Sequence, residues 1–315
     1  MKKRILLGVS SCLLGEKVRF DGGHKRDNYI CDLLSHYVDF LPVCPEVAIG
    51  MGIPRPAIRL IGEAGSPRLV EVKNHQRDYT QPMLDFAHET MKTLTTISGY
   101  ILKSKSPTCG LKRVKIYRGK EQAPLLGEGL YASVLKKAFP YLPIEEEGRL
   151  NDAKIRENFI ERLFIYHDWQ VTMEPGFTGK ELINFHTRHK LALMAHHPHK
   201  SRELGRLVGT LDKENNSTLM LEYLQGLMTI LSFIATPAKH ANVLQHCLGY
   251  FKKVLSAQDK QELLNTITNY QRGLLPLIVP ITLLKHHLSH HPQPYLEMQS
   301  YLSPYPEELM LRNHI

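Results

Sequence analysis

A chain of 315 residues with 43% hydrophobic side chains can bury a core in each of two ordinary domains, which excludes an intrinsically disordered protein. No run approaches the roughly 18 consecutive apolar residues of a membrane span, and no small-residue cleavage site follows the basic start, so we expect a cytoplasmic protein without a membrane partner. The net charge of +9 permits a polyanionic partner, and five cysteines are too few for a secreted disulfide framework.

The first half alternates apolar runs of strand length with helical patterns, which is typical of a mainly parallel sheet with crossover helices. The expected strands are residues 5–9, 38–43 and 100–103. Helical spacing follows at residues 28–37, 81–97 and 130–139. The segment FPYLPIEEEGRLND then combines two prolines, three consecutive glutamates and a glycine, a composition that favours an exposed connection.

Beyond this connection the pattern is wholly helical. The first expected helix covers residues 152–170, and Thr178 with Glu181 forms a capping box for the next, residues 179–197. Further helical segments are expected near residues 201–209, 217–234, 237–256, 259–273 and 276–289. The sequence therefore predicts an α/β N-terminal domain with a mainly parallel sheet over residues 1–145, followed by an all-α C-terminal domain over residues 146–315.

Three of the five cysteines share a setting, because each lies in a loop that follows a predicted strand. Cys12 follows the first strand, Cys44 follows the second, and Cys109 lies a few residues beyond the third. The carboxyl ends of parallel strands lie along one edge of a sheet, where open α/β folds place their sites. Three thiolates that meet there would suit an iron–sulfur cluster with one iron free of protein, or a zinc ion with an open position. Packing as small core residues is the alternative, and it is the role we expect for Cys31 and Cys247.

Two polar side chains are carried by the same loops. Glu46 comes two residues after Cys44, and Ser106 comes three residues before Cys109. A partly shielded carboxylate can act as a general base or acid, and a hydroxyl can position a substrate or a water molecule. A solvated loop carboxylate and a turn cap before Pro107 are the corresponding structural alternatives.

Three segments, in this order and spacing, resemble the TudS-type 2-thiouracil desulfidases: VSSCLLGEKVRFDGG, PVCPEVAIGMGIPRP and ILKSKSPTCG. Enzymes of this type carry a 4Fe-4S cluster on three cysteines. The resemblance implies cluster ligands Cys12, Cys44 and Cys109, catalytic residues Glu46 and Ser106, and substrate-binding residues Ser10 and Asp21.

The second half resembles the helical domain that is fused to this desulfidase in RudS-type proteins, through the segments LINFHTRHKLALMAHHP and YLSPYPEELMLRN. Such fusions are understood to remove sulfur from 4-thiouridine in tRNA. The resemblance therefore implies tRNA as the partner, with conversion of 4-thiouridine to uridine and release of sulfide. The cluster would serve as Lewis acid and sulfur acceptor, and Glu46 would activate water for attack on the ring carbon.

The positive charge gives the implied RNA partner a physical basis. Lys and Arg outnumber Asp and Glu by 23 to 16 up to residue 150 and by 17 to 15 after it. In the second half, basic residues accompany a group of histidines, and we expect RNA contacts from Arg188, Lys190, Lys200, Arg202 and Arg206. A solvated polar helix face is the alternative.

Two further functions remain open from the sequence. The enzyme could act on free 2-thiouracil or a thionucleotide, with the helical domain serving stability or dimerisation. A non-catalytic iron–sulfur protein that binds RNA and senses oxygen or iron would also need three thiolates. Glu46 discriminates against the sensor, because a sensor has no need of a carboxylate beside its cluster.

Overall fold

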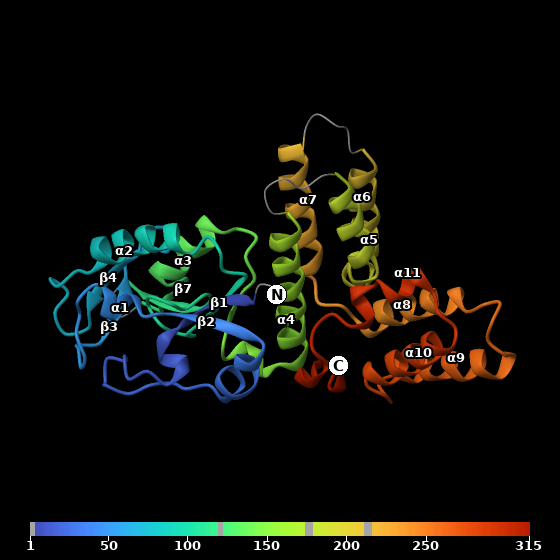
Figure 1. Cartoon of the computed structure of the whole chain (residues 1–315). Coiled ribbons are helices and arrows are strands. Elements are labelled where there is room, and N and C mark those ends of the chain that lie inside the picture. The colour runs from blue at the N-terminus through green and yellow to red at the C-terminus, as the bar shows by residue number, and fades with distance from the viewer. Residues whose placement is uncertain (1–3, 119–121, 174–178, 211–215) are drawn as a thin grey trace. The chain divides into compact units, whose positions relative to one another are not determined.

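The computed structural model describes residues 4–118, 122–173, 179–210 and 216–315. The chain forms two compact units, Met1–Asn151 and Asp152–Ile315. Figure 1 shows an α/β first unit and a helical second unit, as the sequence predicts. Thr178, the expected capping residue, lies outside the described residues. Among the described residues, no helix is both long and apolar enough to cross a membrane.

The first unit is built on a four-stranded sheet whose strands are all parallel, in the order β2-β1-β5-β8. These strands are β1 (Ile5–Ser10), β2 (Val38–Val43), β5 (Gly99–Leu102) and β8 (Ile144–Glu146). Central β1 and β5 are almost wholly buried, because helices and turns cover both faces of a parallel sheet. Their carboxyl ends lie at one edge, so the loops that follow β1, β2 and β5 are brought together.

Strand β8 corrects the expectation of an exposed connection at this point. Glu145 and Glu146 are 8% and 6% exposed, because each carboxylate has partners inside the unit. Glu146 accepts hydrogen bonds from the backbone N–H of Leu111 at 2.8 Å and of Lys112 at 3.3 Å, and Glu145 pairs with Arg149 at 2.8 Å. The first unit therefore continues to Asn151, past the boundary expected at residue 145.

A second four-stranded sheet, in the order β4-β3-β6-β7, was not expected from the sequence. It contains β3 (Ile58–Ile61), β4 (Arg68–Glu71), β6 (Val114–Tyr117) and β7 (Leu125–Gly127). Strands β3 and β6 are parallel, and each has an antiparallel partner at the edge. Strands of three or four residues show too little alternation to be recognised in a sequence.

The helices of the first unit are α1 (Pro45–Ala48), α2 (Thr80–Thr93) and α3 (Leu130–Ala138). Figure 1 shows α2 and α3 on one side of the parallel sheet and the segment between β1 and β2 on the other. The helix expected at residues 28–37 is instead a π turn, Tyr29–Leu33, followed by a 3-10 turn, Leu34–His36. Helix α2 ends at Thr93, four residues before the expected end.

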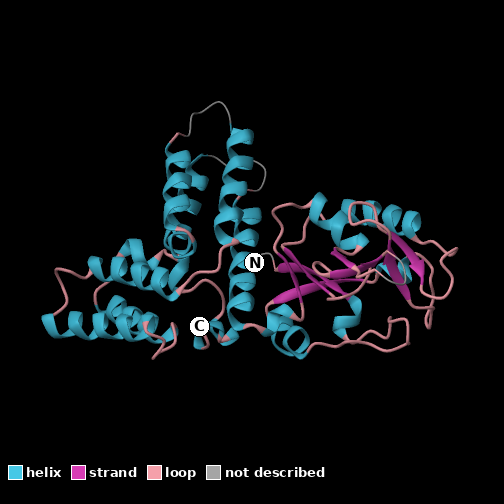
Figure 2. Cartoon of the chain, turned by 180° about the vertical axis from the view of Figure 1, so that it is seen from behind, coloured by secondary structure: helices cyan, strands magenta, loops and turns pink. Residues whose placement is uncertain are grey.

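The second unit is helical throughout its described residues, apart from turns and connections (Figure 2). Its helices are α4 (Ala153–Thr172), α5 (Gly179–His196), α6 (Pro198–Gly209), α7 (Asn216–Leu231), α8 (Pro237–Tyr250), α9 (Ala257–Gln271), α10 (Ile278–His290) and α11 (Pro294–Glu297). Helices α4 to α7 pack together, α8 to α10 form a second group, and contacts between α5 and α8 join the groups.

The core of the helical unit is aromatic near its centre. Trp169 is 6% exposed and stacks on Tyr223 with ring centroids 5.3 Å apart, and Phe185 meets Trp169 edge-on at 5.4 Å. Aromatic pairs in these arrangements add to the gain from burying their large apolar surfaces. The single tryptophan is therefore a packing residue.

Candidate active site

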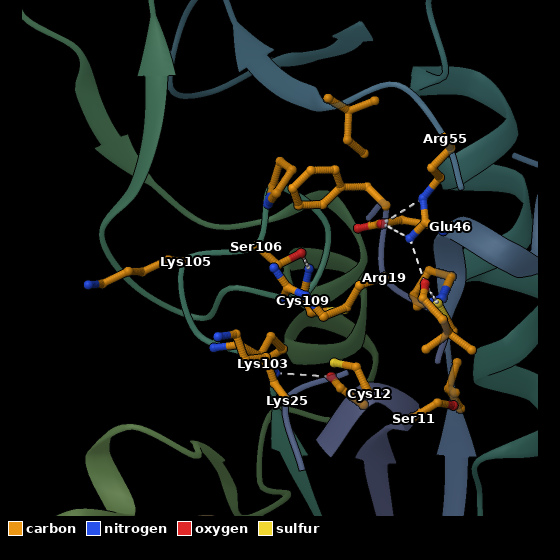
Figure 3. A pocket seen from close by; sticks show the side chains of 18 of the residues that line it. Ser11, Cys12, Arg19, Lys25, Glu46, Arg55, Lys103, Lys105, Ser106 and Cys109 are labelled. Carbon is orange, nitrogen blue, oxygen red and sulfur yellow. Dashed lines mark hydrogen bonds and ion pairs between the residues drawn. The ribbon is translucent and has the colours of Figure 1, made fainter. Parts of the chain in front are cut away.

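The three loop cysteines line one cavity at the carboxyl edge of the parallel sheet. Cys12 lies in the 3-10 turn that follows β1, Cys44 is the N-cap of α1 after β2, and Cys109 lies in the loop after β5. The cavity has a volume of about 340 Å³, and Ser10, Glu46 and Ser106 also line it. Figure 3 shows Cys12, Cys109, Glu46 and Ser106 around this space. The structure thus brings together six of the seven residues that the sequence assigned to the cluster and its pocket.

Burial makes these thiols weak acids. It raises the pKa of Cys12 to about 11, with a further contribution from neighbouring Cys44, and it raises the pKa of Cys109 to about 12, with Glu46 adding to the effect. The pKa of Cys44 is also raised, again mainly by burial. None of the five cysteines forms a disulfide. Within the described residues, no three or more His, Cys, Asp or Glu side chains are placed to hold a single metal ion.

Glu46 is held in the first turn of α1 by a buried arginine. The Arg55 Nε donates to Glu46 Oε2 at 3.1 Å, and Arg55 Nη2 contacts the same oxygen. The remaining donors of the guanidinium reach the carbonyl oxygens of Gly52 at 3.0 Å and Val18 at 2.9 Å. Only 1% of the Arg55 side chain is exposed, against 16% for Glu46. The arginine therefore fixes the carboxylate at the cavity wall while the carboxylate itself stays accessible.

A line of hydroxyl groups leads from Ser106 to the other oxygen of Glu46. Thr108 Oγ1 donates to Glu46 Oε1 at 2.8 Å, and Ser106 Oγ lies 2.9 Å from Thr108 Oγ1. An ionised carboxylate only accepts, so the Thr108 proton points to Glu46 and the Ser106 hydroxyl donates to Thr108. The Ser106 oxygen in turn accepts the backbone N–H of Thr108 at 3.2 Å and of Cys109 at 3.1 Å.

The loop that carries this line of hydroxyls is packed too closely for a side chain at two neighbouring glycines. A Cβ at Gly110 would lie 2.7 Å from the Ser106 carbonyl oxygen, and a Cβ at Gly129 would lie 2.4 Å from the Thr108 carbonyl oxygen. Both distances are shorter than any ordinary contact. Gly110 therefore lets the Cys109 loop turn tightly on itself, and Gly129 lets the N-terminus of α3 pack directly against that loop.

Four more cations line the cavity. Lys103 forms an ion pair with Glu147, whose other oxygen accepts the backbone N–H of Ser104 at 2.7 Å. Arg19, Lys25 and Lys105 also line the space, and Figure 3 shows the Lys105 side chain pointing away from the thiols. Glu46 is the one carboxylate of the described lining. A negatively charged group that bound at this opening would meet an excess of positive charge.

Asp21, a predicted substrate-binding residue, does not line the cavity. Its Oδ1 lies 3.6 Å from Arg19 Nε and accepts the backbone N–H of Gly23 at 3.0 Å. That hydrogen bond is the main reason for the lowered pKa of Asp21. The structure therefore places this carboxylate in an exposed turn, where it shapes the loop that carries Arg19.

The five predicted RNA-binding residues fall into three settings in the helical unit. Lys190, Arg202 and Arg206 line one hollow between α5, α6 and α8. Arg188 forms an ion pair with Asp168 at 2.7 Å. Lys200 lines a different hollow together with Glu203 and Glu222.

Two histidines that accompany these basic residues, His189 and His196, are structural. His189 and His196 are 3% and 1% exposed. His189 Nε2 lies 2.7 Å from Asp168, and His196 Nε2 lies 2.9 Å from Glu161. Their hydrogen bonds are made inside the unit, so these rings cannot reach a ligand.

Arg55 and Thr108 were missed by the sequence reasoning, although both contact Glu46 directly. Thr108 stands beside Cys109, so a search of the residues that flank each candidate ligand would have found it. Arg55 is nine residues from Glu46, and only the folded loop brings the two together. Glu147 was missed for the same reason as Arg55, because it pairs with Lys103 from the turn after β8, 44 residues along the chain.

Comparison with known proteins agrees with this division of the chain. A family model described as 2-thiouracil desulfurase matches residues 7–147, and a model for a protein of unknown function (DUF1722) matches residues 190–306. The first part of the chain belongs to the 2-thiouracil desulfurase family, and a DUF1722 region follows it. The desulfurase match contains the complete lining of the thiol cavity.

Two individual proteins are similar to parts of this member of the desulfurase family. The uncharacterized protein YbgA of Escherichia coli (strain K12) is 31% identical over 165 residues, which is 52% of this chain and 98% of YbgA. A solved structure titled a [4Fe-4S]-dependent thiouracil desulfidase TudS is 30% identical and covers 48% of this chain and 95% of its own, with a TM-score of 0.38.

Proposed function

We propose that this protein is an iron–sulfur-dependent desulfidase that converts 4-thiouridine in tRNA to uridine and releases the sulfur as sulfide. The observation that carries the proposal is the shared cavity, which is lined by one buried thiol, two half-buried thiols and an anchored carboxylate. Membership of the 2-thiouracil desulfurase family supports the type of chemistry. The tRNA substrate is the part of the proposal that goes beyond the family description.

The donor set suits a 4Fe-4S cluster better than a single metal ion. A cluster spreads its thiolate ligands over different irons, so Cys12, Cys44 and Cys109 need to line one space without converging on one point. Their raised pKa values mean that the surrounding protein favours the thiol form, and binding of a metal centre would displace those protons. Three ligands would leave one iron free, and when bound such a cluster supplies a Lewis acid with affinity for a thiocarbonyl sulfur.

The side chains around the cavity fit the hydrolytic half of the reaction. Glu46 accepts a proton from a water molecule as the water adds to the thiolated ring carbon. The carbon–sulfur bond then breaks, so that one water is consumed and one hydrogen sulfide is produced with no net electron transfer. Arg55 and Thr108 hold the two carboxylate oxygens in place for this step, since each donates to one of them.

Ser106 has a positioning role in this scheme. Its oxygen already accepts two backbone N–H groups, and its proton is directed toward Thr108. Both hydroxyl groups donate in the direction of Glu46, so they orient its carboxylate, and the proton that Glu46 takes from water passes to the departing sulfur, which leaves as hydrogen sulfide. The chain of hydrogen bonds also fixes the Glu46 side chain in one orientation, which favours a productive approach of the water.

The tRNA assignment is supported by charge. Arg19, Lys25, Lys103 and Lys105 line the same space as the thiols, and phosphate groups flank the target base in RNA but not in a free base. The test is a kinetic comparison of the anaerobically prepared full chain on thiolated tRNA, on 4-thiouridine monophosphate and on 2-thiouracil. The proposal predicts the highest kcat/KM for thiolated tRNA. Equal or higher kcat/KM for 2-thiouracil would contradict it and favour the free-base enzyme, which the modest cavity volume would also fit.

A further inference from the structure

The hollow between α5, α6 and α8 in the helical unit is lined by three basic side chains and by no carboxylate among the described residues. It has a volume of about 570 Å³, and its charged lining residues are Lys190, Arg202 and Arg206. All three side chains are exposed, so a ligand can reach them from solvent. The helical unit as a whole is nearly neutral, with 17 basic against 15 acidic residues after residue 150, so the charge of this hollow is local.

Among the described residues, these three cations have no partner of their own. No ion pair or side-chain hydrogen bond joins Lys190, Arg202 or Arg206 to any other described residue. Other basic residues of the unit do have partners: Arg188 pairs with Asp168 at 2.7 Å, and Lys239 donates to the carbonyl oxygen of His196 at 2.6 Å. Glu203, which lies between the two arginines along α6, faces His199 at 3.3 Å and lines a different hollow.

Two buried polar side chains form the floor of the hollow. Ser201 is 6% exposed, and its hydroxyl makes no hydrogen bond to another described residue. His186 is 7% exposed, and its Nδ1 lies 3.1 Å from the Tyr223 hydroxyl, which leaves Nε2 unpaired at the wall formed by Gly205. Neither the Ser201 oxygen nor the His186 Nε2 is sealed off from the space, and both residues line it. Each of these two side chains therefore offers the hollow a polar atom that has no partner among the described residues, and a ligand there can form a hydrogen bond with it.

The position of Gly205 keeps this floor open. A Cβ at residue 205 would lie 3.2 Å from His186 Nε2, which is tighter than an ordinary contact. A glycine inside a helix costs up to about 1 kcal/mol relative to alanine, so its presence here needs a reason in packing or function. The open space over His186 supplies one.

We propose that this hollow binds a phosphate group of RNA, with Lys190, Arg202 and Arg206 supplying charge and Ser201 and His186 supplying hydrogen bonds. Arginine donates to phosphate oxygens in pairs, lysine acts as a point charge, and neutral hydroxyl and imidazole groups complete the ligand shell. The volume admits a phosphate together with its ribose. The choice of RNA as the source of the phosphate rests on the proposed function, whereas the binding of phosphate rests on the hollow itself.

The test measures binding of unthiolated tRNA to the full chain by fluorescence anisotropy over a series of salt concentrations. Because this RNA carries no sulfur, the result does not depend on desulfidase activity. The double variant Arg202→Gln, Arg206→Gln should bind roughly tenfold more weakly at low salt, and the slope of log K against log salt should fall by about two. The control Lys252→Gln, Lys253→Gln removes two exposed charges from the turn after α8 and should leave affinity and slope nearly unchanged.

A pair of glycine variants tests the hollow without altering charge. Gly205→Ala places a methyl group against His186, while Gly209→Ala, in the same helix, meets no atom within 4 Å. Gly205→Ala should weaken tRNA binding severalfold and Gly209→Ala should not, with both proteins folded by circular dichroism. Equal affinity and slope in the Arg202, Arg206 variant, the Gly205 variant and the unaltered protein would overturn the proposal.

Calorimetric titration with inorganic phosphate separates the source of the ligand from the site. Under the proposal, inorganic phosphate binds the unaltered protein weakly and competes with tRNA. The heat of phosphate binding should disappear in the variant Arg202→Gln, Arg206→Gln. Binding of inorganic phosphate that depends on Arg202 and Arg206, combined with tRNA binding that does not, would overturn the assignment to RNA.

Discussion

Both units of the chain bury a glutamate against an arginine, but the two pairs sit in different surroundings. In the first unit, Arg55 is sealed while Glu46 keeps 16% of its side chain exposed at the wall of the thiol cavity. In the second unit, Arg312 lies between Glu157 and Glu161, and all three side chains are at most 5% exposed. A buried ion pair alone therefore does not mark an active site, and what distinguishes Glu46 is its access to a cavity lined with nucleophilic ligands.

In the second unit, Arg312, Glu157, Glu161 and His196 form a buried polar group, the Arg312 cluster, which joins the C-terminal segment to the helices. Arg312 Nη1 donates to the Tyr301 carbonyl at 2.5 Å, its guanidinium lies 3.5 Å from Glu157 and 3.7 Å from Glu161, and the Tyr305 hydroxyl donates to Glu157 at 3.0 Å. His196 adds a contact from α5 to Glu161 at 2.9 Å. Every partner belongs to the fold, so we interpret this cluster as a stabilising connection between α4, α5 and the end of the chain.

The largest expected effect separates the three cavity thiols from the other cysteines. Cys12→Ala, Cys44→Ala and Cys109→Ala should each abolish the bound iron and the brown colour of anaerobically prepared protein, since each removes one ligand. Cys31→Ala is the matched control, because Cys31 donates to the Leu13 carbonyl and does not line the cavity. Iron analysis and visible absorption measure the outcome, and stoichiometric zinc in a colourless protein would contradict the cluster assignment.

Replacing the arginine of the Arg312 cluster should lower the stability of the fold and leave desulfidase activity unchanged. Arg312→Met leaves Glu157 and Glu161 buried without their cation, which should lower the free energy of unfolding by about 3–5 kcal/mol. Urea unfolding followed by circular dichroism measures the loss. At a temperature where the variant remains folded, kcat on a free thiobase should match that of the unaltered protein. A large fall in kcat would show that the second unit's cluster takes part in the reaction.

Replacing Glu46, the carboxylate at the cavity wall, should lower activity and leave stability unchanged. Glu46→Gln keeps the size of the side chain but removes the base, so turnover should fall by roughly 10²-fold or more while bound iron and unfolding free energy change little. Steady-state kinetics and iron content on the same preparation measure both properties. Full activity in this variant would require another group to activate the water.

A smaller effect on stability is expected from pH, through the ionisation of Glu161 and His196 in the Arg312 cluster. Burial opposes the charge on Glu161, but His196 outweighs it and lowers the pKa of Glu161 to about 2; burial also opposes the charge on His196, but Glu161 outweighs it and raises the pKa of His196. A lowered carboxyl pKa adds stability above its ordinary value of 4.5, and that gain is lost as the pH falls toward 2. A raised imidazole pKa adds stability below 6.5, and that gain is lost as the pH rises through the raised value.

The stability difference between the unaltered protein and Glu161→Gln should therefore be largest between about pH 4.5 and 6.5 and smaller on either side. Urea unfolding midpoints across this range give the measurement. A difference that does not vary with pH would mean that the two groups are not ionised together in the folded protein.

The same contrast shows which parts of the molecule a sequence can predict. Strands β1, β2 and β5 were recognised because each is an apolar run of strand length, and the shared edge of Cys12, Cys44 and Cys109 follows from a parallel sheet. Strand β8 was misread because its glutamates are buried, and their partners, such as the backbone N–H of Leu111, come from a distant loop. Arg55 was missed for a similar reason, since no spacing rule links it to Glu46. Local patterns predict strands and ligand loops, whereas buried polar partners depend on tertiary contacts.

The most direct test of the proposed reaction is a nucleoside analysis of thiolated tRNA incubated anaerobically with the full chain in water labelled with ¹⁸O. If Glu46 activates water for attack on the thiolated carbon, uridine should replace 4-thiouridine, each new uridine should carry one ¹⁸O atom, and one sulfide should be released per uridine. Glu46→Gln should produce neither product at a comparable rate. Unchanged 4-thiouridine, or uridine formed without the label, would contradict the proposed hydrolysis at this cavity.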